Sequence, residues 1–202
     1  IDGSAEYQKG QFSVAVSPYL YYFTNYIFLA PTGEWSKLPH AGQIYRYMQS
    51  EAVMGGFELS ATQEFGKHLE LLVNGEWLMN KQVGSNGGYP LPFSPPANIF
   101  AELSYKLKPE GKLGGTKVSV HCKKAFEQNR IARNEAVTPG YQTIGLGLHT
   151  TIKTGGKKIL VNVQAHNIFN KKYFNHISFY RKLEIPEPGR NIQVLLSMPL
   201  SR

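Results

Sequence analysis

Histidine is the residue type in this sequence with the clearest potential for chemistry. Three of the six histidines, His121, His149 and His166, fall on the polar positions of three successive segments in which polar and apolar residues alternate. Imidazole rings bind transition metals or act as hydrogen-bonding groups. The sequence contains no His-x-His or His-x-x-x-His pair of the kind that metal sites use. The three rings therefore either line a polar surface as a stop for a metal or chelate, or form ordinary hydrogen bonds there. The spacing predicts no metal site.

No catalytic constellation is evident. The sequence lacks the G-x-S-x-G, P-loop and H-E-x-x-H patterns, and its serines have no placed histidine and acid partners. Its glycine pairs, at 55–56, 87–88, 114–115 and 155–156, are typical of turns or bulges. The one cysteine, Cys122, excludes an internal disulfide and a thiolate zinc site. We expect neither enzyme activity nor a cofactor.

Aromatic and cationic side chains gather in and beside the expected long loops. Aromatic rings stack on the flat parts of a ligand, and cations attract its negative charge. A girdle at a membrane interface combined with loop packing produces the same composition. If the composition serves a ligand, the candidate ligand-binding residues are His40, Tyr45, His176, Phe179, Tyr180 and Arg181.

The chain of 202 residues is basic, with a formal net charge of +8 and a pI near 9.5. Nucleic-acid binding is a poor explanation, because the basic residues are spread over many turns and no helix or RNA-recognition pattern places them. Charged residues make up only 18% and aromatic residues 12%, which argues against a disordered chain or a coiled coil. The composition indicates a β-rich protein with a large buried or lipid-facing surface.

Period-two alternation of polar and apolar residues runs through almost the whole chain and predicts β-strands. We expect eight of them, at 10–30, 43–65, 68–82, 97–108, 115–133, 141–154, 157–170 and 189–200. Short turns alternate with long loops, so the two kinds of connection lie at opposite ends of the sheet. Glycine, threonine, serine, histidine, glutamine and asparagine recur on one face, where a soluble core would need leucine and phenylalanine. The pattern predicts an all-β, antiparallel transmembrane β-barrel segment of about eight long strands.

Two other interpretations of the same pattern remain. A soluble or secreted all-β module, for example one that binds carbohydrate, also has alternating strands. A small closed barrel of eight strands, acting as an adhesin or pore, is a further possibility. No stretch reaches the roughly 20 apolar residues of a helical membrane span, and the N-terminus has no signal-peptide pattern. We interpret a chain that opens at Ile1 as processed or excised from a longer one.

Several motifs resemble those of the TonB-dependent outer-membrane receptors. The run from Asn167 to Tyr173 is similar to their N-L-F-N-K-x-Y signature, and Pro188 to Asn191 is similar to the P-G-R-N that precedes their last strand. Earlier segments agree. They are Tyr22 to Ile27 with Pro31-Thr32-Gly33; Tyr47, Ala52 and Gly55 to Glu58; and, for the branch that imports metals or ferric chelates, Pro90 to Pro92, Pro95-Pro96, Gln128, Glu135 and Thr138 to Tyr141.

The resemblance implies that residues 1–202 form the C-terminal segment of a barrel of about 22 strands, without the plug domain and its TonB box. It implies active uptake of a metal chelate, such as a ferric siderophore or a haem complex, through the outer membrane of a Gram-negative bacterium. The partners would be the chelate, the TonB complex through the absent N-terminal part, and outer-membrane lipid and lipopolysaccharide. Ser201-Arg202 departs from the C-terminal aromatic residue that is usual in the family.

The motif residues also have a physical interpretation of their own. Asparagine caps free backbone groups and tolerates the left-handed conformation, and glycine lets the chain turn toward the last strand. We therefore expect a structural role at the barrel end for Asn167, Phe169, Asn170, Tyr173, Gly189 and Arg190. Glu58 lies opposite Phe57 and Leu59 in the alternation, so it should face the lumen with His121, His149 and His166, because a charge facing lipid is costly.

Overall fold

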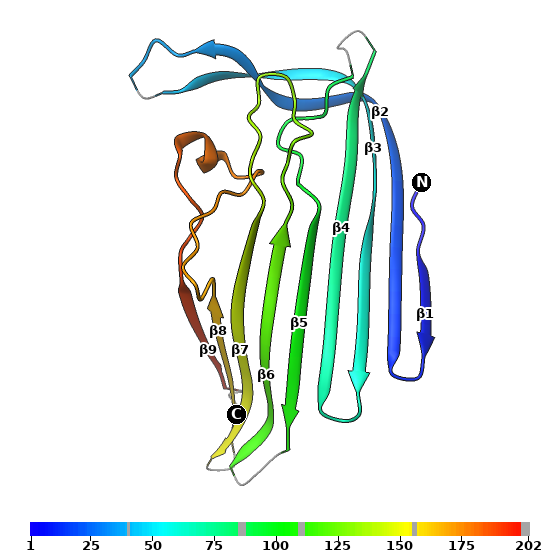
Figure 1. Ribbon diagram of the computed structural model, residues 1–202, viewed down its shortest axis with the longest axis vertical. Coiled ribbons are helices and arrows are strands. Elements are labelled where there is room, and N and C mark those ends of the chain that lie inside the picture. The colour runs from blue at the N-terminus through cyan, green and yellow to red at the C-terminus, as the bar shows by residue number, and fades with distance from the viewer. Residues whose placement is uncertain (40, 85–87, 109–111, 155–156, 199–202) are drawn as a thin grey trace.

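The computed structural model describes residues 1–39, 41–84, 88–108, 112–154 and 157–198. They form a single antiparallel sheet in which each strand pairs with the next one along the chain, in the order β1 to β9 (Figure 1). The strands are β1 (Ala5–Lys9), β2 (Phe12–Trp35), β3 (Gln43–Phe65), β4 (Leu69–Val83), β5 (Asn98–Leu107), β6 (Leu113–Ala125), β7 (Tyr141–Thr154), β8 (Lys157–His166) and β9 (Asn191–Ser197). A 3₁₀ helix, η1 (Phe179–Leu183), lies before β9. No helix in the described part of the chain has the length and hydropathy of a membrane span.

All eight predicted strands are present, but several bounds differ. The first strand continues to Trp35 instead of ending at residue 30, and the seventh ends at His166 instead of residue 170. Two further corrections concern the start of the chain and the fifth strand. The segment β1, which the sequence analysis missed, precedes the first expected strand and pairs with β2 through a tight turn in which Gly10 has a φ of 59°. The strand expected at 115–133 ends at Ala125. Its extension leaves the sheet because the Gln128 side chain donates hydrogen bonds to the carbonyl oxygens of Ser94 and Pro95, at 2.8 and 3.2 Å.

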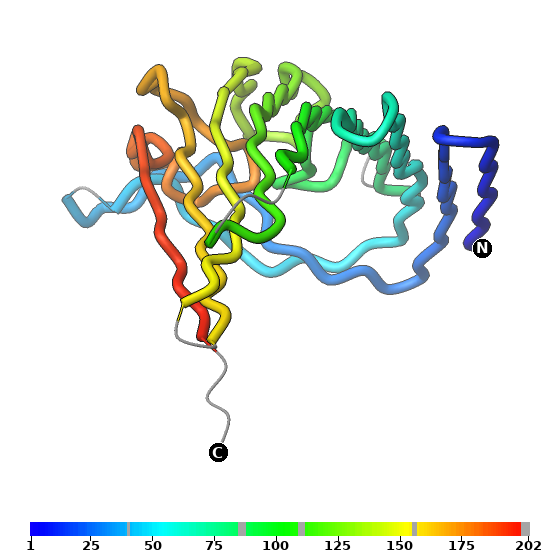
Figure 2. Tube along the Cα trace, turned by 90° about the horizontal axis from the view of Figure 1, so that it is seen from below, coloured from blue at the N-terminus to red at the C-terminus, as the bar shows by residue number. Residues whose placement is uncertain are grey.

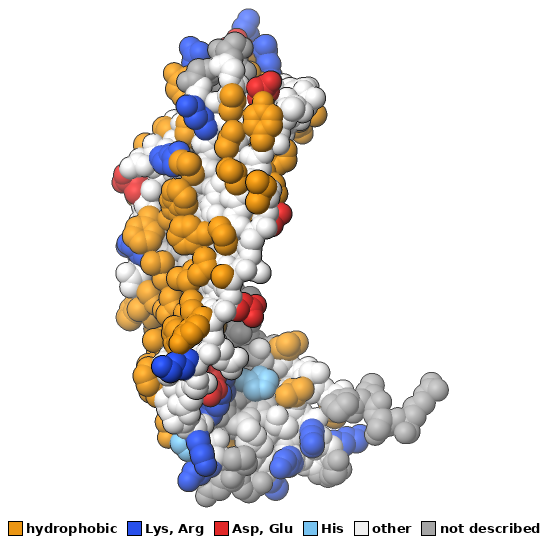
Figure 3. Space-filling view, turned by 90° about the vertical axis from the view of Figure 1, so that its right-hand side faces the viewer, with side chains coloured by type: hydrophobic (Ala, Val, Ile, Leu, Met, Phe, Trp, Pro, Cys, Tyr) orange, Lys and Arg blue, Asp and Glu red, His pale blue; other side chains and the backbone are white. Residues whose placement is uncertain are grey.

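The strand register places apolar side chains on one face of the sheet. Leu103, Val120 and Leu146 are paired neighbours on β5, β6 and β7, and this row continues through Ala165 of β8 to Ile192 of β9. Apolar side chains run along the body of the molecule between basic side chains near its two ends (Figure 3). An exposed apolar band on a sheet of long strands fits the expected contact with lipid.

Charged side chains lie on the opposite face and pair with one another. Nζ of Lys106 lies 2.6 Å from a carboxylate oxygen of Glu70, and Nζ of Lys117 lies 3.1 Å from one of Glu102. These residues occupy β4, β5 and β6 near the short-turn end, and Glu58 lies on the same face in β3. The face opposite the apolar band is therefore polar, and Glu58 lies on this polar face.

The β2–β3 hairpin is longer than its neighbours and bends away from the wall. A register shift between Phe23 and Tyr26 marks the bend, as expected for a β-bulge. Beyond it the hairpin runs over the long-loop end, and seen from below it crosses the open, concave side of the curved wall (Figures 1 and 2). The buried apolar cluster at the bend contains Phe28, Ala52 and Leu91, so a long loop packs against the inner side of the hairpin.

A new positive charge should affect stability differently on the two faces of β7. Leu148 lies on the apolar face near the middle of the strand, and His149 lies beside it on the polar face. In lipid vesicles we expect Leu148→Arg to lower the free energy of unfolding of the native polypeptide that carries this segment by about 2–4 kcal/mol. His149→Arg is the matched control and should change it little. Denaturant titration measures both, and equal losses would contradict this assignment of the faces.

Candidate ligand site at the long-loop end

Three long loops, which include residues 88–97, 126–140 and 167–190, pack together at the end of the sheet that the β2–β3 hairpin crosses (Figure 1). Their contacts are mostly polar. The Asn80 side chain at the end of β4 donates to Oγ of Ser94 at 2.6 Å and accepts the backbone N–H of Leu91 at 2.7 Å. All three residues are buried. Hydrogen bonds from side chain to backbone therefore fix the first loop against the wall, where no regular ladder is available.

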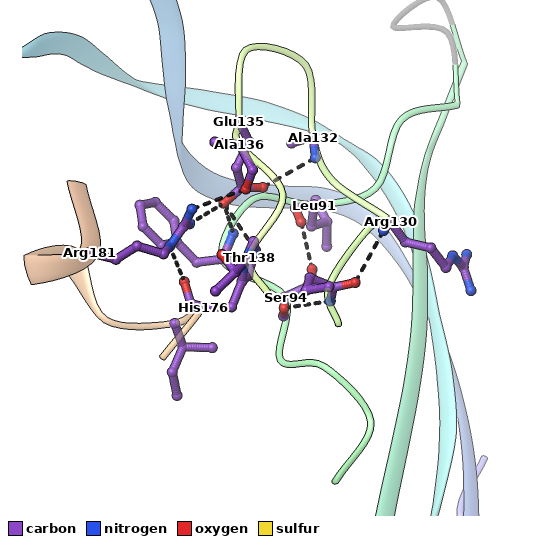
Figure 4. A network of polar contacts seen from close by, with 12 residues as sticks. Leu91, Ser94, Arg130, Ala132, Glu135, Ala136, Thr138, His176 and Arg181 are labelled. Carbon is purple, nitrogen blue, oxygen red and sulfur yellow. Dashed lines mark hydrogen bonds and ion pairs between the residues drawn. The ribbon is translucent and has the colours of Figure 1, made fainter. Parts of the chain in front are cut away.

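Glu135 joins the three loops (Figure 4). Its carboxylate accepts the backbone N–H of Phe93 at 3.1 Å, the backbone N–H of Ala132 at 3.2 Å and Nη2 of Arg181 at 3.2 Å. Nε2 of His176 approaches Oε1 to 3.3 Å without the alignment of a full hydrogen bond. The side chains of Glu135 and His176 are each 1% exposed. A buried carboxylate with this many donors is satisfied, and losing it would leave them unpaired.

The groups around the carboxylate outweigh burial in setting the charge state of Glu135. Burial by itself would raise the pKa of the carboxyl group. The neighbouring His176 and the backbone N–H groups of Phe93 and Ala132 favour the charged form more strongly, so the pKa is lowered from 4.5. Glu135 is thus an anion that holds the loops together at neutral pH.

An aromatic cluster lies beside this carboxylate. The rings of Tyr45 and Phe179 have centroids 5.4 Å apart, and Phe93 lies 6.1 Å from each of them. Nζ of Lys182 is 5.7 Å from the Tyr45 centroid and 5.8 Å from that of Phe93, within cation–π range. Burial, followed by the charge of Arg181, lowers the pKa of Lys182. The cluster packs η1 against the first loop and the hairpin.

A groove of about 880 Å³ opens between the hairpin and the loops. The residues that line it include Arg46, Arg133, Tyr89 and Glu34. Tyr47 also lines it, but its side chain lies on the face of β3 opposite to that of Arg46, because the two residues are consecutive in the strand. Arg46 forms an exposed ion pair with Glu34 at 3.3 Å. Arg133 makes no ion pair within the residues that the structure describes. Tyr89 is 43% exposed, so the groove offers both cationic and aromatic residues to a ligand.

The structure places some of the candidate ligand-binding residues on the surface and buries others between loops. Phe179 and Tyr180 are 49% and 64% exposed, and both could contact an external ligand. His176 and Arg181 instead pack between loops, where they bind Glu135, and Tyr45 belongs to the aromatic cluster. The expectation that His176 meets a ligand from the loop surface is not met in this conformation, because its ring is buried and Nδ1 hydrogen-bonds with Oγ1 of Thr138 at 2.8 Å. His40 lies outside the described residues.

The three histidines expected in the lumen share the polar face but not one height. His121 and His166 have ring centroids 5.5 Å apart. His149 lies four positions further along β7 from Gly145, the residue paired with His121, and is opposite Lys117 and Asn162 instead. Two of the three rings therefore lie close together, and the third lies apart from them.

The motif residues between β8 and β9 organise the last long loop. Asn167 and Asn170 both have positive φ, 49° and 53°. The Asn167 side chain accepts the backbone N–H of Lys171 at 2.9 Å, and that of Asn170 accepts the backbone N–H of Arg190 at 3.0 Å. Any side chain at Gly189 would overlap Oδ1 of Asn170. The absence of a side chain at Gly189 therefore allows this close contact. We had expected a turn in the backbone to be the reason for glycine at this position.

The remaining motif residues differ in their surroundings. Tyr173 packs on Tyr141 at the start of β7, with centroids 4.1 Å apart, whereas the Phe169 side chain is 74% exposed. Arg190 forms no ion pair in the described part of the chain. The link that Glu135 makes between loops was not predicted, since its partners Phe93 and Arg181 are 42 and 46 residues away.

Comparisons with known proteins agree with this geometry. The family model described as "TonB dependent receptor-like, beta-barrel" matches residues 1–170. The fold resembles the copper transporter OprC with a TM-score of 0.73 and 19% identity, covering 95% of this chain and 29% of that one. The fold also resembles BauA, the ferric preacinetobactin receptor from Acinetobacter baumannii, with a TM-score of 0.67 and 16% identity, covering 98% of this chain and 28% of that one. A third similar structure is the FrpB iron transporter from Neisseria meningitidis (F3-3 variant), with a TM-score of 0.64 and 15% identity, covering 96% of this chain and 30% of that one. No curated protein matches in sequence.

Removal of the Glu135 charge should loosen the loops. We expect Glu135→Gln to reduce the local stability of residues 88–97 and 126–140 by about 3 kcal/mol, because it leaves Arg181 buried without its anion. Amide hydrogen exchange of these segments in the native polypeptide measures the loss. Glu127→Gln changes an exposed carboxylate of the same loop and is the control. Protection that is the same in both variants would rule out this role for Glu135.

Acid should loosen the same loops. Because the pKa of Glu135 is lower in the packed loops than its ordinary 4.5, the contribution of its charge is fully present above about pH 4.5. That contribution is lost as the pH falls through the lowered pKa, since the loosened loop binds the proton more readily. Hydrogen exchange as a function of pH should show protection that declines below pH 4.5. In Glu135→Gln this part of the decline should be missing.

Proposed function

This chain belongs to the TonB-dependent receptor-like β-barrel family, and we propose that it forms part of an outer-membrane receptor for the active uptake of a metal chelate. The ligand class is a ferric siderophore or a related iron, haem or copper complex. The similar structures are those of a copper transporter, a ferric preacinetobactin receptor and an iron transporter. They support this class without selecting one member of it.

The groove at the long-loop end is the observation that carries the proposal. Arg133 offers positive charge, and Tyr89, which is 43% exposed, offers an aromatic ring, among the residues that line one cavity. An anionic chelate with flat ligand arms fits this combination. Phe179 and Tyr180 add exposed rings on η1. Capture in the groove would precede passage along the polar face of the wall.

The chain spans less than a third of the solved structures that it resembles. The activity proposed here therefore belongs to the whole receptor, whose N-terminal part would contact the TonB complex. The apolar band faces lipid in this proposal, and lipopolysaccharide surrounds the loop end. The location is the outer membrane of a Gram-negative bacterium.

The other two readings have less support. Side chains such as Leu196 of β9 and Leu146 of β7 are 65% and 48% exposed, which a soluble carbohydrate-binding module would not tolerate as a continuous band. A closed barrel of eight strands does not fit the described residues, which form nine strands with β1 paired only with β2 and β9 only with β8. We therefore retain the receptor.

The test is uptake of radiolabelled iron, supplied as an anionic ferric tris-catecholate, by cells that express the native polypeptide. Uptake should need an intact TonB system. Arg133→Gln should weaken binding about tenfold or more, because it removes a charged hydrogen-bonding partner of the anion. Lys171→Gln, an exposed cation of another loop, should leave binding unchanged. Repeating the assay with a copper complex separates the ligand classes, and uptake of neither metal would oppose the proposal.

A further inference from the structure

Two histidines face each other on the polar side of the wall, away from the loops. His121 of β6 is paired with Gly145 of β7, and His166 of β8 lies one position beyond the pair formed by Leu146 and Ala165. The two histidines thus occupy one row across three strands, with a glycine between them. Neither belongs to the groove or to the Glu135 network.

The two rings lean toward each other across this glycine. Adjacent strands lie about 4.8 Å apart, so residues two strands apart have backbones roughly 10 Å apart. The ring centroids of His121 and His166 are only 5.5 Å apart. Nε2 of His121 occupies the space that a Cβ at Gly145 would need. The glycine therefore leaves the room in which the imidazoles converge.

The ring nitrogens of His121 and His166 are not hydrogen-bonded to neighbouring groups among the described residues. No hydrogen bond joins either ring to another group in the part of the chain that the structure describes. Phe100 contacts His121 through its ring, with centroids 5.7 Å apart. Glu102, the next residue in the row, already accepts hydrogen bonds from Ser104 and Ser119 and pairs with Lys117. The two imidazoles are thus available to each other and to a ligand.

We propose that His121 and His166 together bind a divalent transition-metal ion. A metal bound at about 2.0–2.1 Å to one nitrogen of each of two imidazoles holds the ring centroids roughly 4.5–6.4 Å apart, depending on the N–metal–N angle, and the observed 5.5 Å lies in this range. Imidazole favours copper, zinc and nickel, and Cu²⁺ binds such sites most tightly. This binding depends only on the two rings and stands whether or not the segment serves in uptake.

The site leaves most of the metal coordination open. No group of three or more potential ligands occurs among the described residues, so the protein supplies two nitrogens and the ion keeps water in its other positions. Such an ion exchanges readily, unlike one in a closed four-ligand site. The pair is therefore suited to transient binding on the wall.

Cu²⁺ titration of the purified native polypeptide in detergent, followed by electron paramagnetic resonance, tests the proposal. We expect a signal with coupling to two imidazole nitrogens. His121→Gln and His166→Gln should each remove one nitrogen and weaken Cu²⁺ binding at least about tenfold. His149→Gln removes an exposed histidine from the same face and should leave the signal unchanged. An unchanged signal in both of the first variants, or an equal loss in the control, would overturn the proposal.

A melting experiment excludes a trivial loss of fold. Because Cu²⁺ binds the folded site, it should raise the Tm of the wild-type protein and of His149→Gln, but not that of the other two variants. If a glutamine variant fails to fold, His121→Phe and His166→Phe keep an aromatic ring in place while removing the ligand nitrogen. A wild-type protein without a two-nitrogen Cu²⁺ signal would refute the site regardless of any variant.

Discussion

The alternation of side chains along paired strands is the constraint on which the rest of this structure depends. In hydrocarbon every backbone N–H and C=O must be bonded within the protein, so the strands must stay in register with their neighbours. A slip of one residue in β6 would turn Val120 inward and expose His121 and Lys117 to lipid. The bulge in β2 respects the same constraint, because Phe23 before it and Tyr26 after it both pair with inward positions of β3.

This constraint explains what the sequence could and could not predict. β7 has the predicted bounds because Ile144, Leu146 and Leu148 alternate with polar residues along it. β1 escaped prediction because Ala5–Lys9 is short and carries only two apolar side chains, those of Ala5 and Tyr7. Alternation says which face a residue occupies but not which residue of the next strand it meets. The contact between His121 and His166 depends on that register, and the Glu135 network depends on loops without periodicity, so neither was predictable.

The two edges of the sheet carry a further consequence. β1 and β9 each have one neighbour within the described residues, and the side chains of β9 are exposed along its whole length. Unpaired strand edges are unstable in lipid and prone to association. The wall is therefore complete only when further strands pair with both edges. This agrees with a chain that covers less than a third of the similar structures, and it makes stability in a membrane a property of the whole barrel.

The groove and the histidine pair differ in the chemical form of metal that each one suits. The groove is lined by charged and aromatic residues such as Arg133 and Tyr89, so in our proposal it holds a metal whose coordination is already filled by a chelator. The rings of His121 and His166 must bond the metal itself, and therefore need an ion with open positions. A saturated chelate would pass the pair unless it first gave up two ligand atoms. In our proposals the wall therefore binds loosely held metal, whereas the loops bind the chelate as a whole.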